Sequence, residues 1–215
     1  MVERLSAATA MVGLVADGGR ISETMMMMTS SSSPALTRAL LEMKQCRSTV
    51  QVLFKALCQL EAGRLPFPER ASWIAVEDVV ASLTDCVLAV VELQAVLLGG
   101  EQKRRRTSLE GGGLKLEERE EQEQDEEEEE VDALCLRIHW QLVSMTLMAS
   151  ILKMRSAQAD TSLRPPPRCK TLADVPALSL LPLPLTTDEL GPGRDLYSAA
   201  VYARAVAPFA SCPLT

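Results

Sequence analysis

The chain has 215 residues, of which 47% are hydrophobic but only 3% aromatic. This composition supplies a core of Leu, Val, Ala and Met, and it disfavours a sandwich or a barrel, whose strands favour aromatic and β-branched residues. The formal net charge of −7 comes from residues 117–130, which hold eleven acidic residues and one Arg, so the rest of the chain carries about +3. Such a near-neutral body lacks the basic surface of a nucleic-acid-binding protein.

The first predicted helix spans residues 3–28 and is apolar in its first half. Gly18 and Gly19 lie in its middle, and a kink or a break is expected there because each Gly costs about 1 kcal/mol relative to Ala inside a helix. The apolar stretch is short and Asp17 follows it, which argues against a secretion signal. We expect a face that contacts a membrane or a partner, formed by Leu5, Met11, Val12, Leu14 and Val15.

The second predicted helix has an apolar residue at every third or fourth position from Leu36 to Leu60. Positions three and four apart share one face of a helix, so this spacing predicts a long helix over 35–61 with one buried stripe. Gly63 and Pro66 are expected to end it. The expected stripe is Leu36, Leu40, Met43, Cys46, Val50, Leu53, Leu57 and Leu60.

The same rhythm over 72–98 and 131–157 predicts a third and a fourth helix. Gly99 and Gly100 are expected to end the third helix, since Gly is common just after a helix end. The short connection over 63–71 favours helices that fold back within one chain over a coiled coil between chains. The expected buried positions are Val76, Val79, Val80, Leu83, Cys86, Val87, Val90, Leu93 and Leu97 on the third helix, and Leu134, Ile138, Leu142, Met145, Met148 and Leu152 on the fourth.

Residues 99–130 are expected to form a flexible insert, basic at 103–106 and acidic over 117–130, because blocks of like charge usually remain solvated. The acidic run also suits a solvated helix that continues into the next one, since Glu is a good helix former. Ser108 follows three arginines and is a candidate phosphorylation site for a basic-directed kinase. A plain solvated loop is the commoner meaning of so short a motif.

Nine of the twelve prolines lie beyond residue 161, and proline removes a backbone donor and fixes φ. Residues 161–215 are therefore expected to be a disordered Pro-rich tail, with one short helix over 195–207. The remaining residues, 1–160, are predicted to fold as an all-α, up-and-down bundle of about four long helices.

No residue pattern in the chain indicates a reaction. The single histidine, His139, has no recognisable acid or nucleophile partner, and the G-x-x-x-x-G-K-[ST] phosphate-binding pattern is absent. The six cysteines include no CxxC pair, so zinc is not expected and reduced, buried thiols are. The sequence thus predicts a non-enzymatic protein without cofactor, metal or small-molecule substrate. No run reaches the roughly 18 apolar residues of a membrane span, so a cytoplasmic location is expected.

Three segments together resemble the fungal N-terminal helical domain, or HeLo-like domain, of STAND-type (NLR-like) and ankyrin-repeat proteins. They are residues 5–25, 34–60 and 71–97, with a fourth similarity over 136–140 and 144–152 to the final helix of that family. The third segment carries the most specific part of the resemblance, which is Leu83, Thr84, Cys86, Val87 and Leu88. The resemblance covers about two thirds of the chain.

This resemblance implies a non-enzymatic interaction or signalling module that acts in self/non-self recognition or innate-immunity-like signalling. Such a module self-associates or binds a protein partner. In relatives that execute cell death, the N-terminal helix is thought to leave the bundle and attack the membrane. The resemblance therefore also implies an alternative, which is a membrane-perturbing effector that acts through its N-terminal apolar helix.

Overall fold

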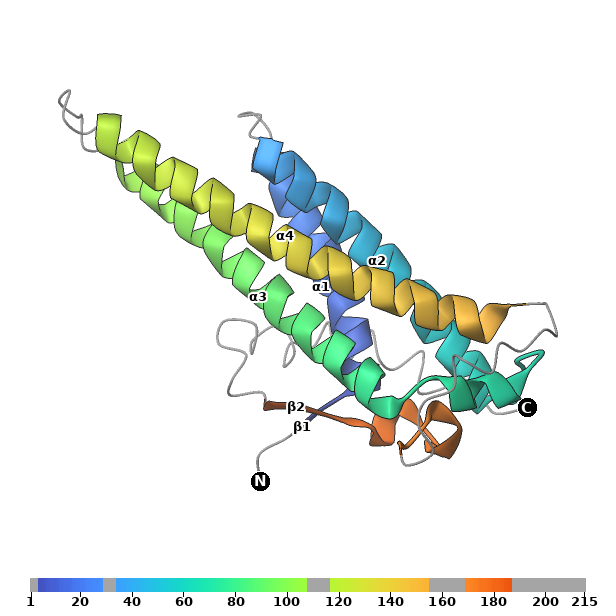
Figure 1. Ribbon diagram of the computed structural model, residues 1–215. Helices are drawn as coiled ribbons and strands as arrows, with labels where there is room; N and C mark the ends of the chain where they lie inside the picture. Colours follow the sequence, from blue (N-terminus) through green and yellow to red (C-terminus); the bar gives the residue numbers. More distant parts are fainter. Residues whose placement is uncertain (1–3, 29–33, 108–116, 155–168, 187–215) are drawn as a thin grey trace.

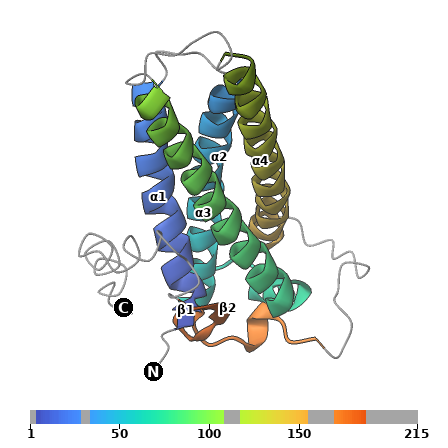
Figure 2. The same cartoon turned by 90° about the vertical axis from the view of Figure 1, so that its left-hand side faces the viewer.

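The computed structural model describes residues 4–28, 34–107, 117–154 and 169–186. Its four long helices are α1 (Ala7–Met28), α2 (Pro34–Glu61), α3 (Val76–Thr107) and α4 (Glu117–Lys153). They run alternately up and down, as predicted for an all-α bundle (Figure 1). Helices α2 and α3 each pack against both α1 and α4, so that α1 and α4 occupy opposite corners (Figure 2).

The core of the bundle contains most of the predicted stripes, together with residues of α1, η1 and the segment 172–185. Six of the eight expected positions on α2 are buried, and so are all six on α4. On α3 six of the nine expected positions are buried, and the other three, Val76, Val80 and Leu97, are partly buried against the core. Full burial of a Leu, Val or Met side chain is worth about 1.5–3 kcal/mol, so these interdigitated aliphatic side chains hold the fold together. The largest fully buried ones include Met43, Leu53, Leu83, Leu93, Ile138 and Met145.

Helix α1 continues through Gly18 and Gly19 without the expected break. The reason is the packing of α2 on this part of α1. A Cβ atom placed on Gly18 would lie 3.5 Å from Met43 Cε and 3.6 Å from Arg47 Cβ, which is ordinary contact distance. Contact with α2 therefore compensates for the low helix propensity of the two glycines.

The described parts of the predicted insert, residues 99–107 and 117–130, are helical. The helix over 117–130 confirms the alternative of an acidic helix that continues into the next one, whereas the expected end of the third helix at Gly99 and Gly100 is wrong. Helix α3 passes Gly99 and Gly100 and ends at Thr107, and α4 already begins at Glu117. The charges suit this arrangement, because basic residues 103–106 lie at the C-terminal end of α3 and acidic residues at the N-terminal end of α4. Both placements are favourable to the helix dipole. Among the described residues, only Gly63 has a positive φ, and it follows the end of α2.

Part of the Pro-rich tail is folded, so the expectation of disorder is wrong for residues 169–186. Two short 3-10 helices, η3 (Leu172–Asp174) and η4 (Leu178–Leu180), lead into strand β2 (Pro182–Thr186). Strand β2 pairs antiparallel with β1 (Arg4–Ser6), beneath the start of α1. A further 3-10 helix, η1 (Pro68–Trp73), joins α2 to α3.

The alternation of Leu and Pro along β2 explains how a proline-rich strand packs against the end of the bundle. Leu181, Leu183 and Leu185 are buried, whereas Pro182 and Pro184 between them are exposed. Successive side chains of a strand point to opposite faces, and a two-stranded sheet tolerates the missing N–H groups of proline. The helix expected over 195–207 lies outside the described residues.

Candidate interaction surface on helix α4

Helix α4 carries two apolar faces. The inner face contains Ile138 and Met145, both 0% exposed. The second face, here called the outer stripe, consists of Leu136, Trp140, Val143 and Leu147, which are 58%, 61%, 47% and 58% exposed. At 3.6 residues per turn, these four positions lie on the side of α4 opposite the core. No element among the described ranges covers them.

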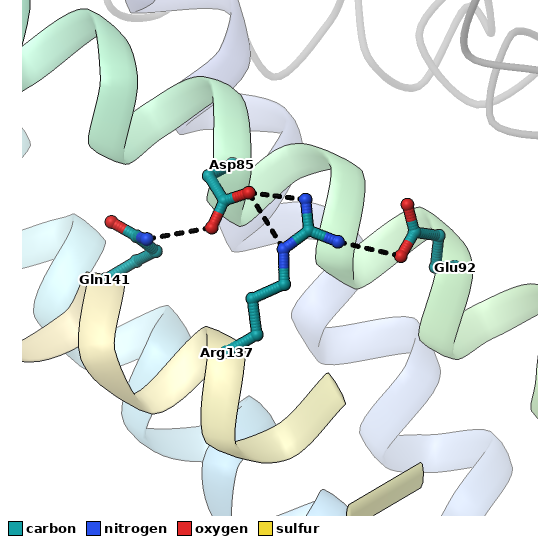
Figure 3. A network of polar contacts seen from close by, with 4 residues as sticks. All are labelled: Asp85, Glu92, Arg137 and Gln141. Atoms are coloured by element: carbon teal, nitrogen blue, oxygen red, sulfur yellow. Dashed lines mark hydrogen bonds and ion pairs between the residues drawn. The ribbon is translucent and has the colours of Figure 1, made fainter. Parts of the chain in front are cut away.

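The edge of α4 that faces α3 is held by a network of charged hydrogen bonds (Figure 3). Arg137 donates from Nε to Asp85 Oδ1 at 2.8 Å and from Nη1 to Glu92 Oε2 at 2.9 Å. Gln141, one turn further on, donates to Asp85 Oδ2 at 2.8 Å. The hydrogen bonds to Asp85 raise the pKa of Arg137 above its ordinary value, which means that Asp85 favours the charged guanidinium that links α4 to α3.

The opposite edge of α4 is held against α2. Asp132 forms an ion pair with Arg38, and His139 Nδ1 lies 3.3 Å from Glu42 Oε1. The His139 ring also meets the Trp140 ring edge to face, with 6.4 Å between the ring centroids. Polar contacts on both edges therefore fix the rotation of α4 about its axis, and this rotation directs the outer stripe away from the bundle.

The N-terminal approach to the outer stripe is acidic. Glu126, Glu129 and Glu130 are exposed on α4, and Glu129 lies two turns before Leu136 on the same side of the helix. The surface thus changes from acidic to apolar along one helix. This arrangement has the chemistry of a binding surface for a helix that is basic at one end and apolar along one side.

The residues expected to form a membrane or partner face lie inside the bundle. Leu5, Met11, Val12 and Leu14 are buried, and Val15 is half-buried. In this arrangement most of the predicted face packs against the other helices, and Val15 is only partly covered. Ser108, the candidate phosphorylation site, lies outside the described residues.

The described cysteines are free thiols, namely Cys46, Cys58, Cys86, Cys135 and Cys169. The Sγ atoms of Cys46 and Cys86 lie 3.7 Å apart in the core, and this hydrogen bond together with burial raises the pKa of Cys86 well above its ordinary value. Burial also raises the pKa of Cys135, to about 11. Both groups are therefore protonated and poorly nucleophilic. Within the described ranges, no cluster of His, Cys, Asp and Glu is placed to hold a metal ion.

Two stretches, Val76–Leu97 and Glu126–Lys153, are long and apolar enough to cross a membrane by length and composition alone. Core helices of soluble proteins pass the same test. Both stretches supply inner-face residues to this bundle, so their apolar character has an explanation in the packing.

Comparisons of the chain with models of protein families, with curated proteins and with solved structures find no significant match. The bundle and its surfaces therefore provide the structural basis for inferring function.

Proposed function

We propose that this protein is a non-enzymatic helical interaction module that binds an amphipathic helix of a protein partner on the outer stripe of α4. One observation carries the proposal, which is the alignment of four large exposed apolar side chains at spacings of four, three and four on a helix held at both edges. This is the spacing with which helices pack against each other. A contiguous apolar surface of this kind is typical of an interaction site.

The charge of the surface indicates the chemistry of the partner. A helix that lies along the outer stripe and continues towards the N-terminal end of α4 meets Glu129 on the same side of the helix, with the exposed Glu126 and Glu130 on neighbouring positions. Basic residues at that end of the partner form complementary pairs with them. If the partner lies antiparallel to α4, these residues fall in its C-terminal turn, where the helix dipole also favours cations. A second copy of the chain is less suited, because its own α4 is acidic.

We further propose that the module is of the HeLo-like type and acts in cytoplasmic signalling downstream of a sensor. The support is the resemblance of residues 5–25, 34–60 and 71–97 to that family, together with the order of long helices in the bundle. The described cysteines are free thiols, three of them buried, which accords with a reducing compartment.

The alternative function is membrane perturbation by the N-terminal apolar helix, and it requires α1 to leave the bundle. The burial of Leu5, Met11 and Leu14 sets this requirement. An engineered disulfide between α1 and α2 tests whether α1 must leave the bundle. A Cβ on Gly18 would lie 3.6 Å from Arg47 Cβ, within the range of about 3.5–4.5 Å for a disulfide. Dye release from anionic liposomes by the reduced Gly18→Cys/Arg47→Cys variant, and no release by its oxidised form, would favour the membrane effector.

Two synthetic helical peptides test the proposed docking. Both carry Leu on one face, and one ends in Lys and Arg while the other ends in Glu. We expect the basic-ended peptide to bind more tightly, and its affinity to fall with added salt because exposed charges are screened. The Leu147→Asp variant should lose binding, and Thr146→Asp, an adjacent exposed position on the same helix, should retain it.

Equal binding of the basic-ended peptide by Leu147→Asp and Thr146→Asp would refute the assignment of the outer stripe. Sedimentation of the chain alone examines self-association. A dimer that dissociates in Leu147→Asp but persists in Thr146→Asp would make a second copy, and not a partner helix, the occupant of the outer stripe.

A further inference from the structure

A groove runs along the outside of the α1–α2 pair, and α4 takes no part in its lining. Its volume is about 630 Å³, within the range of roughly 300–1,000 Å³ that is usual for small-molecule sites. From Met11 to Glu23 it follows α1 for a length of about 18 Å at 1.5 Å per residue. Its apolar lining consists of Met11, Val12, Val15, Ala16, Phe54 and Cys58.

Small residues leave this space open. Ala16 and Gly19 line the groove from α1, and neither has a side chain long enough to fill it. The guanidinium of Arg47 lies above Gly19, since its Nη1 atom is 3.5 Å from the position that a Cβ on Gly19 would take. Arg47 therefore reaches across from α2 to α1 at the Gly19 end.

The two ends of the groove differ in charge. Arg20 and Arg47 line the Gly19 end with one acid of the lining, Glu23, and the buried Asp17 also interacts with Arg20. Met11, Phe54 and Cys58 form an apolar surface towards the other end, where Lys55 also lines the groove. The lining thus carries three cations and one anion. A long, narrow, apolar groove with a cationic end complements a single alkyl chain that terminates in one anionic group.

We propose that this groove binds a long-chain fatty acid, with its carboxylate between Arg20 and Arg47 and its alkyl chain along Val15, Ala16, Met11 and Phe54. A guanidinium matches a carboxylate in charge and in planar geometry, and the apolar walls remove the alkyl chain from water. The groove lies apart from the outer stripe of α4, so this site adds a ligand to a protein whose proposed partner is a helix.

Calorimetric titration of the delipidated full-length protein with oleate, below its micelle concentration, tests the proposal. We expect saturable binding with one oleate per chain. Oleyl alcohol, which has the same chain without the charge, should bind about 10-fold or more weakly, because a hydrogen bond to a charged group is lost. Acetate, which has the charge without the chain, should show no saturable binding.

Matched variants locate the site. Ala16→Phe should abolish oleate binding by filling the groove, whereas Ala81→Phe, at an exposed position of α3, should bind oleate like the wild type. Arg47→Gln should weaken binding about 10-fold, and Arg64→Gln, which lies beyond the end of α2, should not. Circular dichroism confirms that each variant is folded.

Three results would overturn the proposal. They are the absence of saturable oleate binding by the folded chain, equal affinities for oleate and oleyl alcohol, and oleate binding that survives Ala16→Phe. Loss of oleate binding in Leu147→Asp would move the ligand to the outer stripe, which also contradicts the groove. Binding of the basic-ended peptide to the Ala16→Phe variant is measured separately. The proposal of peptide docking on the outer stripe and the proposal of oleate binding in the groove can therefore fail independently.

Discussion

The two faces of α4 have similar composition and similar spacing but opposite surroundings. Ile138 and Met145 are enclosed by the bundle, while Leu136, Trp140 and Leu147 lie in solvent on the same turns. The apolar rhythm predicted the longer, inner stripe of α4, which is buried, but it gave no role to the shorter outer stripe. Polar residues hold the two edges between these faces, because Arg137 reaches Asp85 on α3 and His139 reaches Glu42 on α2.

The largest expected effect is a difference in the free energy of unfolding between mutations on the inner and the outer face of α4. Ile138→Ala should lower the free energy of unfolding by about 2–5 kcal/mol, because it leaves a cavity in the core. Leu136→Ala, two residues away on the outer stripe, should change it by no more than about 0.5 kcal/mol. Urea unfolding of both variants measures the difference. Equal losses would show that the outer stripe is buried in the folded protein.

The next prediction contrasts a buried acid on α1, Asp17, with the acids that contact the edges of α4. Those acids are paired with basic residues of another helix, whereas Asp17 is buried. Asp17 is 6% exposed, and desolvation raises its pKa from 3.8 to about 6, partly offset by Arg20. The folded state then holds the proton more tightly than the unfolded state. The stability from this group is fully present below pH 4 and is lost as the pH rises through 6.

The Asp17→Asn variant lacks this loss. Between pH 4 and pH 7.5 the wild type should lose on the order of 2 kcal/mol of unfolding free energy that the Asp17→Asn variant keeps. Urea unfolding of both proteins at the two pH values measures this difference. Glu23→Gln, an exposed position on the same helix, serves as the control and should show little pH dependence. A wild type and an Asp17→Asn variant with parallel pH profiles would contradict the raised pKa of Asp17.

The smaller effects concern the two edges of α4. A double-mutant cycle of Asp85→Ala and Arg137→Ala should give a coupling energy of about 1 kcal/mol, since the pair is half-buried and Asp85 accepts several hydrogen bonds. The same cycle for Arg38 and Asp132, whose side chains are more exposed, should give less than about 0.5 kcal/mol. A larger coupling energy for Arg38 and Asp132 than for Asp85 and Arg137 would show that the α2 edge, and not the α3 edge, holds α4 more strongly.

Much of the fold follows from local spacing, and the four helices and the inner stripes were predictable for that reason. The exceptions depend on contacts between distant residues. Gly18 and Gly19 remain helical because α2 packs on them, and β2 pairs with β1 from the far end of the described chain. The alternation of Leu and Pro over 181–185 was the signal of that strand, but proline composition outweighed it.

The candidate surfaces were less predictable than the fold. The outer stripe is present in the sequence as Leu136, Trp140, Val143 and Leu147, but the pattern expected of buried positions favours the longer inner stripe and gives this second one no role. The network of Asp85 with Arg137 joins residues 52 positions apart, and no sequence pattern signals this pairing. The groove was missed entirely, because it depends on how closely α1 approaches α2 and on the small side chains at Ala16 and Gly19.

Acrylamide quenching of Trp140 tests most directly the central claim, which is that the outer stripe of α4 is an open docking surface for a partner helix. The chain has two tryptophans, and Trp73 is buried, so the Trp73→Phe variant reports on Trp140 alone. We predict strong quenching in the free chain and a clear decrease when the basic-ended peptide saturates it. Strong quenching that is unchanged by the peptide, or weak quenching before the peptide is added, would contradict an open docking surface on α4.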